Sequence, residues 1–247
     1  MAYNVAVDVG GTFTDVLVFN EGTGELTDTK VLSTTEDPSQ GVVTGIERVC
    51  EKVGISFADL ILLFHGTTVV TNMILTNTGA RVGLLTTHGH EQILHLARAW
   101  TPGPLYGWMQ LDKPDPPANL TDTVGINERL GADGGEIQAL DEEEVHRAVE
   151  DLVEKGVEAL AIGFLNSYVN PDHERRVRDI VQEMYPDLPV TISSDIGQEY
   201  GEYERTLTTV VNNAVQPRTQ TYMSGFESSI EEKGFQGSLS IIRSDGG

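Results

Sequence analysis

Alternating apolar and polar positions at the start of the chain predict a β-strand. Four apolar side chains spaced two residues apart share one face of it: Tyr3, Val5, Val7 and Val9. Residues 16–19 form a second apolar run, and the turn-forming cluster at residues 20–24 separates it from a third run at residues 26–32. These three segments predict an antiparallel meander.

After the meander, helical spacing alternates with short apolar runs. Helical periodicity is found at residues 38–53, 141–153, 170–184, 201–215 and 217–233. Runs typical of strands occur at residues 60–64, 81–85, 159–164, 190–192 and 239–242. Asp141, with Glu144 three residues later, predicts the capped start of one helix. Helices and strands in alternation predict a mixed α/β sheet flanked by helices.

Residues 100–123 interrupt this rhythm. Five prolines forbid regular helix here: Pro102, Pro104, Pro114, Pro116 and Pro117. Trp100, Tyr106 and Trp108 are concentrated in the same stretch. A loop of this length in a compact domain is usually functional or part of an interface. We therefore expect this excursion to serve a function or to contact a partner.

Residues 8–15 have the most chemical content. They join the first two predicted strands as a tight turn, in which Gly10 and Gly11 let the backbone approach a ligand without a Cβ in the way. Backbone N–H groups in such a turn can converge on phosphate oxygens. Thr12 and Thr14 add hydroxyl donors. The segment therefore predicts a phosphate-binding loop.

Two carboxylates, Asp8 and Asp15, flank this turn. They cannot grip phosphate directly because like charges repel, but Mg²⁺ can stand between carboxylate and phosphate, usually through retained waters. The alternative is an ordinary hairpin whose Asp and Gly residues serve turn geometry alone. The segment is neither a P-loop, which opens a helix with Gly-Lys-Ser/Thr, nor a dinucleotide fingerprint, which also needs a helix.

The octapeptide between two strands resembles the first phosphate loop of the actin, sugar-kinase and Hsp70 ATPase superfamily. More closely, the chain resembles the hydantoinase/oxoprolinase family, whose members include hydantoinases, 5-oxoprolinase and ATP-dependent ketone carboxylases. Three further stretches carry this resemblance: His65–Asn72, Asn166–Glu174 and Glu199–Thr206. Residues 89–91 and 100–104 are more similar to the ketone carboxylases than to the hydantoinases.

The resemblance implies an actin-like ATPase lobe of the ribonuclease H-like class. Residues 1–195 would form the N-terminal lobe, and residues 196–247 would begin the following catalytic domain. ATP would phosphorylate a carbonyl or enolate oxygen of a cyclic amide or ketone before hydrolysis or carboxylation, often with a partner subunit similar to hydantoinase B. A complete member carries a second phosphate loop and an adenine-binding segment, so we expect this chain to be a fragment that is inactive alone.

The resemblance also assigns roles to residues. The phosphates of ATP would be held by Gly10, Gly11, Thr12 and Thr14. The other residues of the nucleotide site would be Phe13, His65, Thr67 and Thr68. Asp8 and Asp15 would be the catalytic pair and would hold Mg²⁺ through water. For Thr67 and Thr68, capping of the following helix is the simpler alternative. Two other functions stay open: a nucleotide-binding regulatory or assembly module without its own chemistry, and a sugar-kinase-like phosphotransferase.

Two other polar clusters suggest chemistry but have simpler structural interpretations. The first contains suitable ligands for a further divalent metal: His88, His90, Glu91 and His95. It lacks a fixed helical pair of histidines, which favours structural or exposed histidines. The second contains groups that acid–base catalysis can use: Glu199, Glu202, Glu204 and Arg205. A salt-bridged surface or interdomain contact is its commoner role.

Composition limits the partners. The chain has 38 acidic and 16 basic side chains, a net charge of −22, which repels nucleic acid and anionic lipid. No apolar run approaches the roughly 20 residues that a bilayer requires, and the N-terminus lacks the pattern of a signal peptide. Cys50 is the only cysteine and fits a reducing compartment. We therefore expect a cytoplasmic protein.

Overall fold

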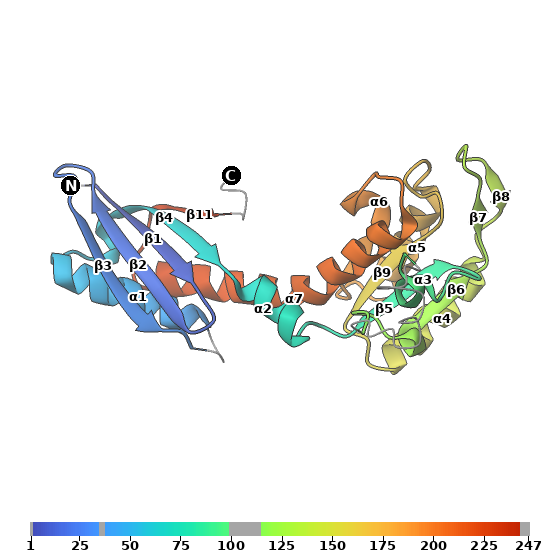
Figure 1. Cartoon of the computed structure of the whole chain (residues 1–247), viewed down its shortest axis with the longest axis horizontal. Coiled ribbons are helices and arrows are strands. Elements are labelled where there is room, and N and C mark those ends of the chain that lie inside the picture. The colour runs from blue at the N-terminus through green and yellow to red at the C-terminus, as the bar shows by residue number, and fades with distance from the viewer. Residues whose placement is uncertain (1, 35–37, 99–114, 243–247) are drawn as a thin grey trace, which may run out of the picture. The chain divides into compact units, whose positions relative to one another are not determined.

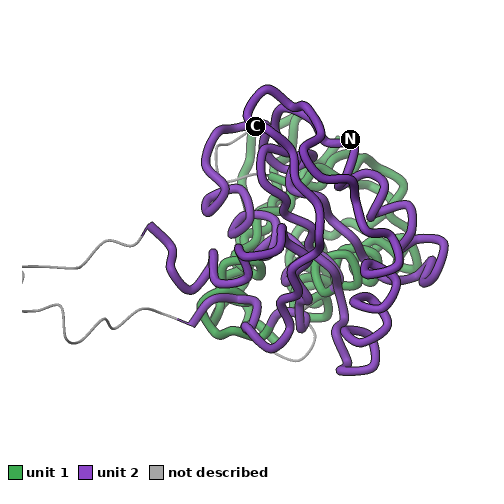
Figure 2. The backbone as a smooth tube through the Cα atoms, turned by 90° about the vertical axis from the view of Figure 1, so that its right-hand side faces the viewer, with its two compact units in different colours: residues 1–78, 218–247 green, residues 79–217 purple. Residues whose placement is uncertain are grey.

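The computed structural model describes residues 2–34, 38–98 and 115–242. It divides into two compact units, coloured separately in Figure 2: residues 1–78 with 218–247, and residues 79–217. The second unit is thus inserted, along the sequence, between the two segments of the first. The predicted boundary between residues 195 and 196 stays a prediction, because it separates two family domains along the sequence, whereas these units are groups of residues in mutual contact.

The first unit is built on a five-stranded mixed sheet with the strand order β11-β4-β1-β2-β3 (Figure 1). Its antiparallel part is the predicted meander: β1 (Tyr3–Val9), β2 (Phe13–Asn20) and β3 (Leu26–Leu32). Two strands extend the sheet in parallel: β4 (Leu60–Thr67) and β11 (Ser238–Ile241). A one-turn 3₁₀ helix, η1 (Phe57–Asp59), precedes β4, and α2 (Val69–Thr76) follows it.

One face of this sheet packs on two helices, α1 (Pro38–Val53) and the part of α7 (Glu202–Glu232) that belongs to the first unit (Figure 1). The alternating residues of β1 are all buried there, which confirms the predicted face: Tyr3, Val5, Val7 and Val9. They join a core with helical side chains: Val42, Ile46, Val49, Phe226 and Ile230. The opposite face carries exposed apolar side chains: Phe13, Leu17, Leu26 and Leu32.

The second unit contains a four-stranded parallel sheet with the order β10-β9-β5-β6. Its strands are β5 (Val82–Thr87), β6 (Thr123–Ile126), β9 (Ala159–Gly163) and β10 (Val190–Ile192). β5 and β9 are buried along their whole length, as central strands of a parallel sheet are. The sequence predicted these strands but not their separation into a second sheet.

Helices cover both faces of this parallel sheet. α4 (Glu142–Glu154) and α5 (Asp172–Met184) share one apolar core with it. α3 (Ile93–Leu96) and the first half of α7 pack on the other face. The remaining elements are a two-stranded hairpin and two short helices: β7 (Arg129–Leu130), β8 (Glu136–Gln138), η3 (Leu120–Asp122) and α6 (Ser193–Ile196).

Two local predictions have different outcomes. Asp141 is the N-cap of α4 and accepts a hydrogen bond from the Glu144 N–H at 2.9 Å, as predicted. The two helices predicted at residues 201–215 and 217–233 are wrong as separate elements, because α7 is a single helix with Pro217 inside it. Proline removes one helical hydrogen bond, but buried side chains on both sides of Pro217 keep the helix continuous.

Part of the Pro- and Trp-rich excursion, residues 99–114, lies outside the described residues. Within the described ranges, no helix is long and apolar enough to cross a bilayer.

Candidate functional site

The turn between β1 and β2 is closed at its base by main-chain hydrogen bonds. The Gly10 N–H donates to the Phe13 carbonyl at 3.0 Å, and the Ser33 N–H donates to the Thr12 carbonyl at 3.0 Å. A Cβ at Gly10 would lie 3.0 Å from the Phe13 oxygen, so a side chain there would collide with backbone. Among the residues that the structure describes, none accepts a hydrogen bond from the N–H groups of Gly11 and Thr12. These two amides are available to a ligand.

A cavity of about 520 Å³ opens beside this turn. Gly10, Gly11 and Thr12 form one wall of it, and α2 contributes Val69, Asn72, Met73 and Thr76. A volume of this order is typical of small-molecule sites. The turn therefore borders a space that can hold a ligand.

Asp8 and Asp15 directly face each other across β1 and β2. Both are exposed. Lys30 Nζ lies 3.0 Å from Asp15 Oδ1, whereas no residue of the described chain forms a hydrogen bond or ion pair with the Asp8 carboxylate. Gly66 is paired with Asp8 on the other side, and a Cβ there would lie 3.7 Å from Asp8 Oδ1. Like charges directly opposite each other are destabilising, so the free Asp8 is the better candidate for a cation.

Thr14 and Phe13 lie at the base of the turn and do not face the cavity. Thr14 is fully buried, and its Oγ1 lies 3.0 Å from Ser33 Oγ, which donates to the Gly10 carbonyl at 2.8 Å. Phe13 is 44% exposed, and Lys30 Nζ lies 5.1 Å from its ring centroid. Thr14 therefore braces the turn from the core side. The predicted contact of Thr14 with phosphate, and that of Phe13 with nucleotide, stay predictions.

Thr67 and Thr68 connect the start of α2 to the β1–β2 turn. The N–H and Oγ1 of Thr68 both donate to the Val9 carbonyl, at 3.0 and 3.1 Å. Thr67 Oγ1 accepts from the Val69 N–H at 3.1 Å, and thereby satisfies the first N–H of α2. Thr68 occupies the N-cap position without a side-chain cap bond. A contact of either hydroxyl with nucleotide remains a prediction.

His65 is fully buried on the core side of β4. Its Nε2 lies 3.0 Å from the Tyr222 hydroxyl, and its ring stacks on Phe226 with centroids 4.8 Å apart. Burial lowers the pKa of His65 to about 4, so the ring is neutral at physiological pH. His65 does not line the cavity beside the turn, and its predicted contact with nucleotide stays a prediction.

The histidine cluster does not form a metal site. His88 Nδ1 lies 3.4 Å from Glu91, while the buried Nδ1 atoms of His90 and His95 have no hydrogen-bond partner. No group of three His, Cys, Asp or Glu side chains within residues 2–34, 38–98 and 115–242 is arranged to hold a metal. Asp8 and Asp15 are two carboxylates, which is the number that Mg²⁺ commonly uses together with phosphates and waters.

Comparison with known proteins identifies the chain. The family model described as the hydantoinase/oxoprolinase N-terminal region matches residues 4–185, and the model described as hydantoinase/oxoprolinase matches residues 205–247. The chain belongs to the hydantoinase/oxoprolinase family. It is 33% identical to the acetophenone carboxylase gamma subunit of Aromatoleum aromaticum, over 99% of this chain and 35% of the relative. It is also 33% identical to the caprolactamase subunit alpha of Pseudomonas jessenii, over 99% of this chain and 36% of the relative.

Solved structures agree with this membership. The ATP-dependent caprolactamase from Pseudomonas jessenii matches 99% of the chain with a TM-score of 0.88 and 31% identity. Nucleotide-free acetone carboxylase matches 97% with a TM-score of 0.85 and 26% identity. The chain covers 36% of each of these chains. The predicted fold, an actin-like α/β lobe whose mixed sheet starts with an antiparallel meander, is confirmed.

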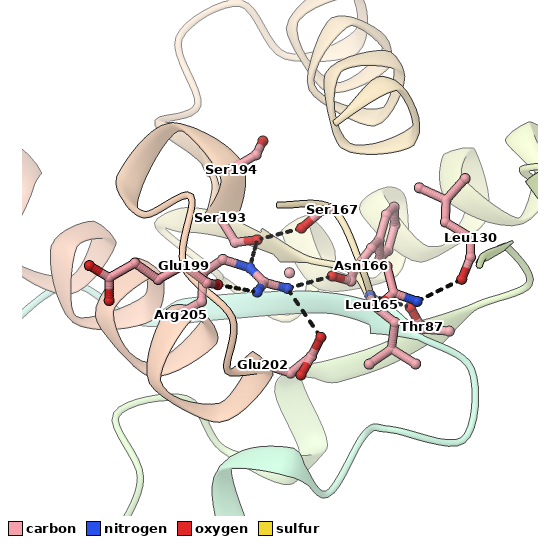
Figure 3. A network of polar contacts seen from close by, with 12 residues as sticks. Thr87, Leu130, Leu165, Asn166, Ser167, Ser193, Ser194, Glu199, Glu202 and Arg205 are labelled. Atoms are coloured by element: carbon pink, nitrogen blue, oxygen red, sulfur yellow. Dashed lines mark hydrogen bonds and ion pairs between the residues drawn. The ribbon is translucent and has the colours of Figure 1, made fainter. Parts of the chain in front are cut away.

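The other stretches that carry the family resemblance lie in the second unit, where Arg205 forms a buried network (Figure 3). Arg205 is 4% exposed. Its Nε donates to Ser193 Oγ at 3.0 Å, and Nη1 and Nη2 donate to the carbonyls of Glu199 and Phe164 at 3.1 and 3.0 Å. Glu202 lies 3.9 Å from Nη2. Because its acceptors include two backbone carbonyls, this family residue holds segments together, which fits a structural role.

Residues 166–174 of this family member anchor the β7–β8 hairpin. Asn166 Nδ2 donates to the Leu130 carbonyl at 2.8 Å (Figure 3), and Asn170 Nδ2 donates to the Gly134 carbonyl at 3.0 Å. Asn166 has a φ of 59°, a left-handed conformation that asparagine tolerates better than most residues. The sequence did not predict this hairpin, because its two strands are too short to show alternation.

Proposed function

We propose that this chain carries the phosphate-binding loop of an ATP-dependent enzyme that phosphorylates a carbonyl oxygen. The oxygen belongs to a cyclic amide that is then hydrolysed, or to a ketone that is then carboxylated. A caprolactamase and an acetophenone carboxylase among the relatives represent these two outcomes. Both relatives are named as subunits, which supports a second subunit as a partner of this chain as well.

The observation that carries the proposal is the arrangement around the β1–β2 turn. The free N–H groups of Gly11 and Thr12 are donors of the kind that bind phosphate oxygens. Asp8, which has no partner within the described residues, provides a carboxylate for Mg²⁺ and its waters. Asp15 is already neutralised by Lys30, so it shapes the charge around Asp8 more than it holds the metal. ATP bound here with Mg²⁺ would supply the phosphoryl group.

The proposal is tested by Asp8→Asn in the full-length protein. We expect its affinity for Mg·ATP to fall at least about tenfold, because the metal loses a charged contact through water. The affinity for ATP without Mg²⁺ should not fall. Asp28→Asn is the matched control, since Asp28 is an exposed acid of β3 in the same sheet. Equal calorimetric affinities of wild type and Asp8→Asn for Mg·ATP would contradict the proposal.

Two other functions predict different results. A regulatory module would bind nucleotide without turnover even with its partner subunit present. A sugar-kinase-like enzyme would phosphorylate an alcohol and would not depend on a partner. Turnover of ATP that requires a carbonyl compound and the partner subunit separates the proposed function from both.

A further inference from the structure

The cavity beside the phosphate turn has a distinct chemical lining. Its walls combine apolar side chains of α2, Val69 and Met73, with the neutral polar groups of Thr12, Asn72 and Thr76. No Lys, Arg, Asp or Glu of the described chain lines it. Burying a charged group without a partner is costly, so the part of this cavity beyond the amides of Gly11 and Thr12 favours an uncharged ligand.

Asn72 is the polar group best placed in this cavity. A Cβ at Gly11 would lie 3.3 Å from Asn72 Nδ2, so the carboxamide rests directly against the turn that carries the two free amides. The contact of Nδ2 with Thr68 Oγ1 is long, at 3.4 Å, and satisfies at most one of its two N–H groups. One N–H donor therefore remains for a ligand oxygen.

We propose that this cavity is the substrate subsite, that it takes a small uncharged carbonyl compound, and that Asn72 donates a hydrogen bond to the carbonyl oxygen. The inference rests on the proposed function, because it places that oxygen next to the amides of Gly11 and Thr12. Val69 and Met73 would pack against the hydrocarbon part of the ligand. Asn72 then positions the oxygen that receives the phosphoryl group.

Two probes that share one ring test the selectivity for an uncharged ligand. 2-Pyrrolidinone is a neutral cyclic amide, and 5-oxoproline is the same ring with a carboxylate. We expect saturation-transfer NMR on the full-length protein with Mg²⁺ and a non-hydrolysable ATP analogue to detect 2-pyrrolidinone. The charged probe should bind at least about tenfold more weakly, because its carboxylate finds no cation in the cavity. Absence of 2-pyrrolidinone binding, or equal binding of both probes, would overturn the proposal.

Asn72→Leu tests the positioning residue. It keeps the size of the side chain but removes the donor, so binding of 2-pyrrolidinone should fall about tenfold or more. Thr71→Leu is the matched control, because Thr71 is exposed on the same helix and does not line the cavity. Unchanged probe binding in Asn72→Leu would refute the role of Asn72. If this variant does not fold, Asn72→Ala, which favours helix, replaces it.

The affinity for the ATP analogue separates this inference from the proposed function. Calorimetry should show an affinity in Asn72→Leu within about threefold of wild type, because a single neutral hydrogen bond is all that changes. A parallel loss of nucleotide and probe would assign Asn72 to the nucleotide and overturn the inference. If the wild type binds no nucleotide, the proposed function fails. Binding of 2-pyrrolidinone without nucleotide still tests whether the cavity takes an uncharged carbonyl compound.

Discussion

The imidazole Nδ1 of His173 lies 2.8 Å from a carboxylate oxygen of Glu128, whose side chain is completely buried. Nε2 of the same ring lies 3.1 Å from Glu136 on the β7–β8 hairpin. Burial alone lowers the pKa of His173, but the hydrogen bonds and negative charges of the two glutamates outweigh it and raise the pKa above its ordinary value. The two glutamates thus favour the protonated ring, which links α5 to the hairpin.

His173→Gln should therefore destabilise the protein in a pH-dependent way. A raised pKa stabilises the fold fully below the ordinary histidine pKa, and this contribution disappears as pH rises through the folded-state value. We expect the free energy of unfolding to fall by an amount on the order of 2 kcal/mol near pH 6, and the difference from wild type to shrink towards alkaline pH. Thermal unfolding at several pH values measures it. His146→Gln is the control, because His146 is exposed; the same pH profile in both variants would contradict the assignment.

His65 predicts the opposite dependence. Its pKa is lowered by burial to about 4, so the unfolded chain binds a proton that the folded chain does not bind between pH 6.5 and 4. Stability is therefore complete above pH 6.5 and falls as the pH drops through this window, by roughly 3 kcal/mol in total. His65→Gln should flatten this slope in chemical denaturation. Tyr222→Phe should keep the slope, because burial causes the shift; loss of the slope in Tyr222→Phe would show the cause to be the hydrogen bond.

Arg205→Lys tests whether the charged cluster is structural. Lysine cannot reproduce the three hydrogen bonds that the planar guanidinium of Arg205 donates. Because the buried acceptors then lose their partner, we expect the free energy of unfolding to fall by roughly 3 kcal/mol. Arg175→Lys, at an exposed position, should change stability little. Below its unfolding temperature, the Arg205→Lys variant should keep the kcat/KM of the wild type. A large drop in kcat with unchanged stability would restore the acid–base interpretation.

Much of the first unit could be predicted from the sequence because its strands are marked by patterns among neighbouring residues. The alternation of Tyr3, Val5, Val7 and Val9 determines which face of β1 is buried. In the second unit, Asp141 likewise marks the start of α4 with its own side chain. These signals depend on neighbours within a few residues. The octapeptide turn was found for the same reason.

The features that the sequence did not predict depend on contacts between segments far apart in the chain. Ser33 and Lys30 reach the β1–β2 turn only because β3 pairs with β2, which places Lys30 opposite Asp15. A register drawn for the predicted meander would have found this pair. No comparable signal shows that Arg205 is buried, since its acceptors include the carbonyl of Phe164, 41 residues away. Pro217 suggested a break between two helices, but the packing of α7 outweighs the loss of one helical hydrogen bond at the proline.

Cys50 should be unreactive in the folded protein. Burial, followed by the charges of Asp59 and Glu47, raises the pKa of its thiol to about 11, so almost no thiolate exists at neutral pH. A disulfide reagent such as DTNB should label the native chain only as fast as the chain unfolds. Full labelling in denaturant is the control. Rapid labelling of the native protein would contradict the burial of Cys50, a residue of α1, in the core of the first unit.

Alanine substitutions at the two glycines of the β1–β2 turn should have different effects. A Cβ at Gly10 meets the backbone oxygen of Phe13 at 3.0 Å, which cannot move without opening the turn, so Gly10→Ala should destabilise the protein by about 1–3 kcal/mol and weaken Mg·ATP binding. A Cβ at Gly11 meets only the end of the Asn72 side chain, at 3.3 Å. That side chain can rotate away, so Gly11→Ala should keep the unfolding temperature of the wild type.

If Asn72 positions the substrate oxygen, Gly11→Ala should weaken the binding of 2-pyrrolidinone more than the binding of nucleotide, because the new methyl group displaces the carboxamide that binds the probe. Combining Gly11→Ala with Asn72→Leu isolates this effect. Since both changes act on one contact, the double variant should bind the probe about as weakly as Asn72→Leu alone. Fully additive losses would show that Gly11 and Asn72 act independently, and that the close approach of the turn to α2 has no part in holding the substrate.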